Sequence, residues 1–312
     1  FLNLYEPIGH KPMQGGFPNI KKLVSHIFGE QYELGMDYLQ LLYLRPVQKL
    51  PILLLVSEER NTGKTTFLNF LKALFQDNVT FNTNEDFRSQ FNSDWAGKLL
   101  IVVDEVLLSR REDSERLKNL STTLSYKVEA KGKDRNEISF FAKFVLCSNN
   151  ESLPVIIDEG ETRYWVRKIS SLQSDDTDFL EKLKAEIPAF LFHLQGRTLS
   201  TEHKSRMWFA PEQIATDALR RIIRCNRNRL EVEMSELFHE VMENTQTDSL
   251  QFCLNAAIAL LQCNHVKAEK HLVRKIVQDC WKLQPSENAL TYTSYEYNYN
   301  SSGHYSPTKR VG

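Results

Sequence analysis

The segment from residue 50 to residue 75 constrains the fold more than any other part of the chain. Residues 50–56 form a short, almost entirely apolar run, and the polar turn that follows contains Gly63. Over residues 65–75, apolar side chains recur at the spacing of an amphipathic helix. This pattern predicts a buried strand that passes through a tight loop into a helix.

Other short apolar runs alternate with helical patterns and predict further strands of the same sheet. We expect strands at residues 79–81, 99–103, 144–147 and 164–169, and helices at residues 84–91 and 114–124. Strands that alternate with helices are typical of a mainly parallel sheet with helices on its faces. The chain is therefore predicted to contain an α/β core around a mainly parallel five-stranded sheet.

Changes in pattern divide the chain into four predicted parts. Residues 1–47 form a small helical lead-in or collar, and residues 48–195 carry the α/β core. Strand signals stop after about residue 175, so residues 196–290 are expected to form an α-helical or winged-helix-like domain. Residues 291–312 are rich in Tyr, Ser and Asn and are expected to be a flexible tail.

Charge and cysteine content exclude several classes of protein. There are 39 Lys and Arg against 40 Asp and Glu, so any surface that binds nucleic acid must be local. The longest apolar stretches fall far short of the ~20 residues that cross a bilayer. Five cysteines without a CxxC pair favour a reducing compartment, which we expect to be the cytoplasm. The chain starts at Phe1 without a signal-peptide pattern, so we expect a soluble protein or a fragment of a longer one.

The loop of residues 58–65 has the composition of a phosphate-binding site. It reads Glu-Glu-Arg-Asn-Thr-Gly-Lys-Thr and leads directly into the predicted helix. In a P-loop, backbone N–H groups and the helix N-terminus bind phosphate oxygens, and the lysine reaches the β- and γ-phosphates. The residues predicted to bind ATP are Arg60, Asn61, Thr62, Gly63, Lys64, Thr65 and Thr66. The alternative is an ordinary glycine turn capped by Thr65.

Two adjacent acids, Asp104 and Glu105, end the predicted strand at residues 99–103. Burial penalises each charge unless the pair holds a cation or a proton, and the pair fits a Walker B motif. Asp104 and the Thr65 hydroxyl are expected to bind Mg²⁺, and Glu105 to orient or deprotonate the attacking water. One departure puts the early loop in doubt, because Glu58 stands where the GxxxxGK[ST] pattern has its first glycine.

With these motifs the sequence resembles superfamily 3 helicases of the AAA+ class, and most of all the helicase part of phage- and viral-type primase-helicases. The resemblance rests on four motifs between residues 51 and 169. The third is an apolar strand at residues 143–150 that ends in Ser-Asn-Asn. The resemblance implies that this strand lies between the strand before the P-loop and the strand before Asp104. It also implies that Asn149 reaches the γ-phosphate and the attacking water. Without the flanking motifs, the Asn pair would be an ordinary turn.

The fourth motif is Arg163, which matches the family's arginine finger. A guanidinium suits this role because it is always charged and meets phosphate oxygens with two parallel hydrogen bonds. Arg167 is the backup candidate, and the alternative is that Arg163 is a surface arginine paired with Glu161 or Glu159. A finger supplied to a neighbouring subunit requires a ring, and the resemblance implies a hexamer.

Residues 127–136 resemble a β-hairpin whose tip carries Lys131, Lys133 and Arg135. The resemblance implies that this hairpin projects into the ring channel and contacts the backbone of single-stranded DNA. The alternative is a solvated charged hairpin, because nearby acids dilute the positive charge. A second basic region at residues 220–229 is expected either to bind DNA or to pair with acidic neighbours.

Together these observations favour an ATP-dependent DNA helicase, a ring-forming translocase that replicates a phage, virus or mobile element. Its expected partners are single-stranded or forked DNA, copies of itself and a primase domain, either upstream or in trans, in the cytoplasm of a bacterial host. The first alternative is an AAA+ ATPase that loads or remodels replication or transposition proteins without unwinding DNA. The second is a nucleic-acid-binding module that has lost hydrolysis, for which Glu58 is the support.

Overall fold

A computed structural model describes residues 6–88, 93–108, 110–128, 136–172, 176–286, 288–298 and 304–311. The chain forms two compact units, Phe1–Ile223 and Arg224–Gly312, and each is described by itself. Within the described ranges, no helix has both the length and the apolar composition needed to cross a bilayer.

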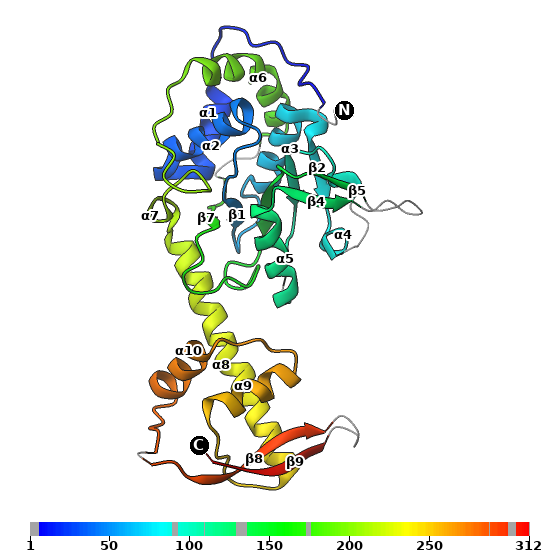
Figure 1. The fold of residues 1–312 in the computed structure, drawn as a ribbon. Coiled ribbons are helices and arrows are strands. Elements are labelled where there is room, and N and C mark those ends of the chain that lie inside the picture. The colour runs from blue at the N-terminus through cyan, green and yellow to red at the C-terminus, as the bar shows by residue number, and fades with distance from the viewer. Residues whose placement is uncertain are drawn as a thin grey trace. The chain divides into compact units, whose positions relative to one another are not determined.

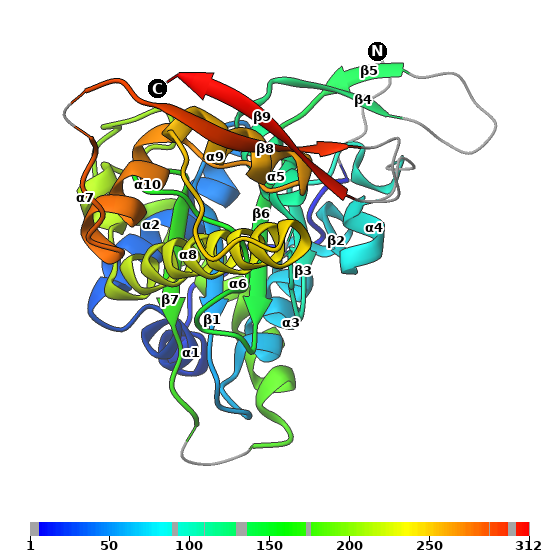
Figure 2. The same ribbon diagram turned by 90° about the horizontal axis from the view of Figure 1, so that it is seen from below.

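Five parallel strands form the central sheet of the first unit, in the order β2-β3-β6-β1-β7 (Figure 2). Their bounds are Ile52–Val56 for β1, Val79–Asn82 for β2, Leu100–Val103 for β3, Lys143–Ser148 for β6 and Tyr164–Lys168 for β7. The predicted strands and the α/β fold class are therefore confirmed. As expected, β6 lies between β1 and β3, so the carboxyl ends of these three strands lie side by side.

Both faces of the central strands are buried, which explains why β1 and β3 are apolar at every position. In β1, Leu53 and Leu55 pack into one core, whereas Ile52, Leu54 and Val56 pack into the other. The first core contains side chains of α1 (Pro18–Phe28), α2 (Tyr32–Leu44), α3 (Lys64–Phe75) and α6 (Phe179–Gly196). The second contains side chains of α4 (Asn84–Arg88), α5 (Arg111–Thr122) and the first turns of α8 (Asp217–Thr245). The short helices η1 (Gly29–Gln31), η2 (Gln76–Asn78), η3 (Ser93–Trp95) and α7 (Pro211–Ile214) complete this unit.

Helices α1 and α2 belong to the same unit as the sheet and lie next to α6 (Figure 1). Asp37 of α2 is fully buried and accepts hydrogen bonds from the backbone and hydroxyl groups of Ser200 and Thr201. At the start of α1, the Glu186 carboxylate of α6 accepts the Ile20 N–H at 2.9 Å. Because these contacts tie α1 and α2 to the segment around α6, the predicted lead-in of residues 1–47 is not a separate part.

An antiparallel hairpin follows α5 and consists of β4 (Ser125–Val128) and β5 (Asn136–Ser139) (Figure 1). Tyr126 stacks on the buried ring of Trp95, with 6.0 Å between the ring centroids, and so connects the hairpin to the second core. The strands agree with the hairpin predicted from the sequence.

The second unit contains most of α8, then α9 (Leu254–Cys263), α10 (Lys270–Lys275) and the π-helical turn η4 (Ile276–Cys280). It ends in a twisted antiparallel ribbon of β8 (Thr291–Asn298) and β9 (His304–Val311) (Figure 2). The described part of this region therefore contains helices followed by an antiparallel hairpin, and it is not helical throughout.

The structure corrects two predicted boundaries. The units divide between Ile223 and Arg224, not near residue 195, because Leu219 and Ile222 of α8 still pack into the second core of the first unit. Residues 291–312, predicted to be a flexible tail, contain the β8–β9 ribbon. Tyr292 and Tyr305 are buried in it, and tyrosine rings bury as much apolar area as the aliphatic side chains that this segment lacks.

Candidate active site

The loop between β1 and α3 adopts a conformation that depends on specific residues. Gly63 has φ 78° and ψ 6°, in the left-handed region that glycine enters without steric cost, and α3 begins at the next residue, Lys64. Asn61 also has a positive φ of 54°, and asparagine tolerates this region better than most residues. The loop therefore turns sharply into the helix N-terminus, the arrangement in which backbone N–H groups can face an anion.

The first of the two adjacent acids lies directly against this helix. The Thr65 hydroxyl donates a hydrogen bond to Asp104 Oδ2 at 2.9 Å, so the start of α3 and the end of β3 meet. Glu105 has φ 57° and donates its backbone N–H to Asp104 Oδ1 at 3.1 Å. A hydroxyl and a carboxylate at this spacing are the hard oxygen donors that Mg²⁺ prefers.

Asn149 lies beside the second acid, at the end of the neighbouring strand β6. Its Nδ2 donates a hydrogen bond to Glu105 Oε1 at 3.5 Å. Two further contacts hold the strand ends together: Val106 N donates to Cys147 O at 2.7 Å, and Ser148 Oγ donates to Val106 O at 2.9 Å. The carboxylate of Glu105 and the amide of Asn149 thus face the same space, as the strand order requires.

These side chains surround a cavity of about 380 Å³. It is lined by Glu59, Arg60, Asn61, Thr62, Gly63, Lys64, Thr65, Thr66, Asp104, Glu105 and Asn149. The structure thus brings together all seven predicted loop residues, the two acids and the asparagine. Glu59 is the one lining residue that the sequence did not single out.

Lys64 is one of two basic residues that line this cavity, and it is largely buried. Burial lowers the pKa of its ammonium, and the negative charge of nearby groups, including Asp104, opposes that shift. Nζ donates a hydrogen bond to Thr62 Oγ1 at 3.2 Å. On the other side of the loop, His26 Nε2 of α1 lies 3.0 Å from the Thr62 carbonyl. The contact of α1 with the loop was not predicted, because nothing in the sequence near His26 signals it.

Glu58 does not disrupt the loop, which resolves the doubt raised by the missing glycine. It is absent from the residues with positive φ, so its backbone conformation does not require glycine. Its N–H donates to Glu151 Oε1 at 3.1 Å, and its carboxylate pairs with Arg221 at 3.2 Å. Arg221 and Lys168 also bind Glu151 Oε2, each at 2.9 Å.

Glu151 is a second residue of this region that sequence reasoning missed. Its side chain is 3 % exposed, and it is held by Lys168, Arg221 and the Glu58 N–H. Burial alone raises the pKa of its carboxyl, but these hydrogen bonds and charges outweigh burial and lower the pKa. Part of the basic region at residues 220–229 is therefore paired with acids, since Arg220 likewise pairs with Asp217 at 2.7 Å.

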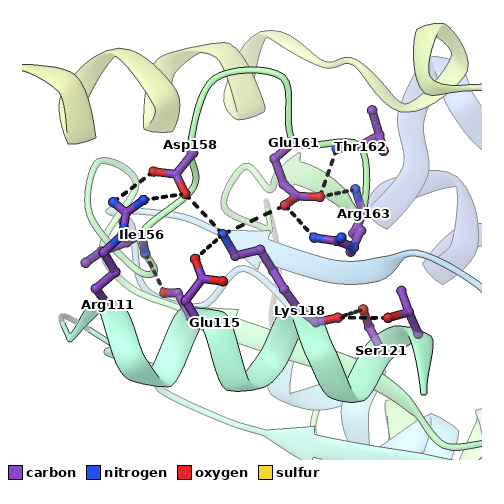
Figure 3. Close-up of polar contacts among 11 residues, drawn as sticks. Arg111, Glu115, Lys118, Ser121, Ile156, Asp158, Glu161, Thr162 and Arg163 are labelled. Atoms are coloured by element: carbon purple, nitrogen blue, oxygen red, sulfur yellow. Dashed lines mark hydrogen bonds and ion pairs between the residues drawn. The ribbon is translucent and has the colours of Figure 1, made fainter. Parts of the chain in front are cut away.

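Arg163 does not line this cavity. It precedes β7, and Tyr164 is opposite Ile52 at the beginning of β1, whereas the loop follows the end of β1 at Val56. Its guanidinium pairs with Glu161 at 2.8 Å, the partner weighed in the alternative interpretation (Figure 3). Within one chain, Arg163 thus lies at the amino-terminal ends of the strands, whereas the cavity lies at their carboxyl ends.

Arg167, the backup candidate, is also paired within the chain and does not line the cavity. Its side chain is 9 % exposed and its Nη1 binds Glu30 Oε1 at 2.7 Å and Gln31 Oε1 at 2.8 Å. It therefore connects β7 to the segment between α1 and α2. The predicted DNA-binding residues Lys131, Lys133 and Arg135 lie outside the described residues.

Comparisons with known proteins agree with this architecture. Residues 55–167 match a family of unknown function (DUF5906), and no curated protein matches the chain. An apo structure of the NrS-1 C-terminal region is similar over 100% of this chain and 80% of that one, with a TM-score of 0.65 and 16% identity. An A-form structure of the same region covers 90% of this chain and 75% of that one, at a TM-score of 0.61 and 15% identity. At these identities the similarity shows a shared fold, and it agrees with the predicted α/β fold class.

Proposed function

We propose that this protein is an ATP-dependent DNA helicase that moves along single-stranded DNA as a ring. The observation that carries the proposal is the cavity in which the loop, Lys64, the Thr65–Asp104 pair and the Glu105–Asn149 pair meet. Each group has the chemistry that phosphoryl transfer to water requires, and all of them lie on adjacent strand ends.

In the proposed reaction, the loop N–H groups and Lys64 bind the phosphates of ATP. Thr65 and Asp104 hold Mg²⁺, which supplies positive charge to the phosphate oxygens. Asn149 and Glu105 orient a water molecule whose oxygen attacks the γ-phosphorus, and Glu105 takes the proton. The bond between the γ-phosphorus and the bridging oxygen breaks, so that ADP leaves with that electron pair.

Arg163 supports a ring because it lies at the opposite end of the strands from the cavity of its own chain, so it could serve only the cavity of another chain. In a head-to-tail ring it would approach the ATP of the next subunit, where its charge stabilises the transition state. We further propose a hexamer, with the tip of the β4–β5 hairpin contacting DNA phosphates in the channel.

Two other functions lead to different results in the same assays. An ATPase that loads or remodels proteins would hydrolyse ATP without unwinding a forked duplex. A binding module would not hydrolyse ATP, but the only sequence feature that favoured it was Glu58, and this residue keeps the loop conformation through Glu151 and Arg221.

The test is hydrolysis and unwinding by three variants. Lys64→Ala and Glu105→Gln should each lower ATP turnover by at least ~10²-fold, because each removes a group that acts on the transition state. Lys72→Ala is the matched control, since Lys72 is on the same helix but contacts Val79 O and Asp77 away from the cavity. Single-stranded DNA should stimulate the unmodified protein, and a forked duplex should be unwound. Full turnover by either active-site variant would rule out the proposed site, and hydrolysis without unwinding would favour the loading function.

A further inference from the structure

Six charged side chains of alternating sign surround the beginning of β7 (Figure 3). They are Arg111, Glu115 and Lys118 of α5, and Asp158, Glu161 and Arg163 from the segment that leads into β7. Three cations and three carboxylates balance, and Arg163 is at one end of this cluster. If the Arg163 side chain moves away, the cluster therefore loses one of its three positive charges.

Glu161 is fixed in position and largely withdrawn from water. Its side chain is 9 % exposed. Its Oε1 accepts the backbone N–H groups of Thr162 and Arg163, both at 2.9 Å, and its Oε2 accepts Arg163 Nη1 at 2.8 Å. Because the backbone contacts do not involve the guanidinium, Glu161 keeps its place if the Arg163 side chain moves away. Its desolvated charge would then lose its nearest cation, which is costly unless another cation replaces it.

Lys118 is the cation in position to do so. Its side chain is 7 % exposed, and Nζ lies 2.7 Å from Glu115 Oε1, 3.0 Å from Asp158 Oδ2 and 3.9 Å from Glu161 Oε2. An ammonium has three N–H donors, so the first two contacts leave one for Glu161. Burial lowers the pKa of Lys118, but the hydrogen bonds to Glu115 and Asp158 more than offset it, so the pKa is raised and the charge is retained.

We propose that Glu161 is shared between two cations, pairing with Arg163 when this side chain is held back and with Lys118 when Arg163 engages phosphate in the neighbouring subunit. Lys118 is thus a positioning residue that lowers the cost of releasing the arginine. The inference rests on the proposed role of Arg163 in a ring. The flexible stem of lysine permits the movement of about 1 Å that would bring Nζ within hydrogen-bond distance of Glu161.

The experiment measures kcat for ATP, with DNA present, in four variants of the cluster and in Arg163→Ala. Among the described residues, Lys118→Met leaves Arg163 as the one cation within ion-pair distance of Glu161, so release becomes harder and kcat should fall about tenfold. Glu161→Gln keeps an oxygen for the backbone N–H groups but removes the charge, so kcat should stay within about twofold. The double variant should recover most of the loss caused by Lys118→Met. Arg111→Met is the matched control, because Arg111 pairs with Asp158 at 3.1 Å in the same cluster, and it should leave kcat unchanged.

The outcomes separate this inference from the proposed function. If Arg163→Ala turns over normally, Arg163 has no role in hydrolysis and the proposed ring chemistry fails. If Arg163→Ala is inactive but Lys118→Met is normal, or is impaired and not rescued by Glu161→Gln, sharing of Glu161 is wrong while the function stands. Should Lys118→Met fail to fold, Lys118→Gln, which also lacks the charge but keeps N–H donors, replaces it under the same criteria.

Discussion

At the scale of single residues, two buried lysines of the first unit, Lys143 and Lys49, have a lowered pKa and lie away from the candidate active site. Lys143 at the start of β6 is 2 % exposed and donates to the Pro46 carbonyl, and Lys49 donates to the Phe140 carbonyl at 2.9 Å. Burial lowers the pKa of Lys143 to about 7, helped by the charge of Lys49. The native state therefore binds fewer protons at Lys143 than the unfolded chain does between this pKa and that of free lysine.

Stability should accordingly rise with pH across this window. The unfolded lysine titrates near 10.5, so the free energy of unfolding increases from about pH 7 upward as the unfolded state gives up the proton that the native state lacks. Lys143→Met should remove the slope between about pH 7 and pH 8 and reduce it above pH 8, where Lys49, whose pKa burial lowers to about 8, still contributes. The same change should raise stability at pH 7, as measured by urea unfolding at several pH values. Lys72→Met, at a half-exposed position, is the control and should keep the slope. An unchanged slope in Lys143→Met would show that Lys143 is not its source.

The same scale shows which site residues the sequence could predict. Lys64, Thr65, Asp104 and Asn149 follow apolar strands at fixed spacings, and the parallel sheet brings strand ends together, so their meeting in one cavity was predictable. Glu151, in contrast, is held by hydrogen bonds from Lys168 and Arg221, which are 17 and 70 residues away along the chain. Contacts at such separations depend on tertiary packing, for which a single sequence carries no local pattern.

At the scale of elements, strands were predicted better than the ends of helices. Strands β1 and β3 are apolar throughout, because helices cover both faces of the sheet. The helix predicted at residues 114–124 instead begins at Arg111 and ends at Thr122, and the long helix α8 runs from Asp217 to Thr245. Leu219 of α8 packs into the second core of the first unit, whereas Leu230, Met234 and Val241 pack into the core of the second unit. The helical pattern of the sequence therefore continues although the core that the helix packs into changes.

The β4–β5 hairpin carries the prediction that belongs to this scale. Strand β4 ends at Val128 and strand β5 begins at Asn136, so the residues predicted to contact DNA lie in the segment that connects the two strands. Lys131→Ala combined with Lys133→Ala should leave hydrolysis without DNA unchanged, and should abolish DNA-stimulated hydrolysis and unwinding, because phosphate contacts supply the attraction. Lys182→Ala with Lys184→Ala, exposed on α6, removes the same charge elsewhere and should have no effect. Normal unwinding by the hairpin variant would point to another DNA path.

At the scale of the whole molecule, acids and bases are nearly equal in number, and the structure places them close to one another. Cations lie beside the acids both in the cavity at Asp104 and Glu105 and in the cluster before β7. The chain therefore has little bulk charge to hold DNA. Each subunit would make only a few contacts with DNA phosphates, so several subunits would have to bind the same strand together. The proposed function therefore requires a ring.

Mixing two inactive variants tests whether neighbouring subunits complete one another's sites. Arg163→Ala keeps an intact cavity and Lys64→Ala keeps an intact arginine, so a competent interface needs one of each in the right order. Random equal mixing should restore about a quarter of the unmodified rate, since each of two neighbours is of the required kind half the time. Each variant incubated alone is the control and should stay inactive. Mixed rings that are verified by mass and yet hydrolyse no ATP would contradict an arginine supplied across the interface, whereas recovery would show that hydrolysis belongs to the assembly rather than to the single chain.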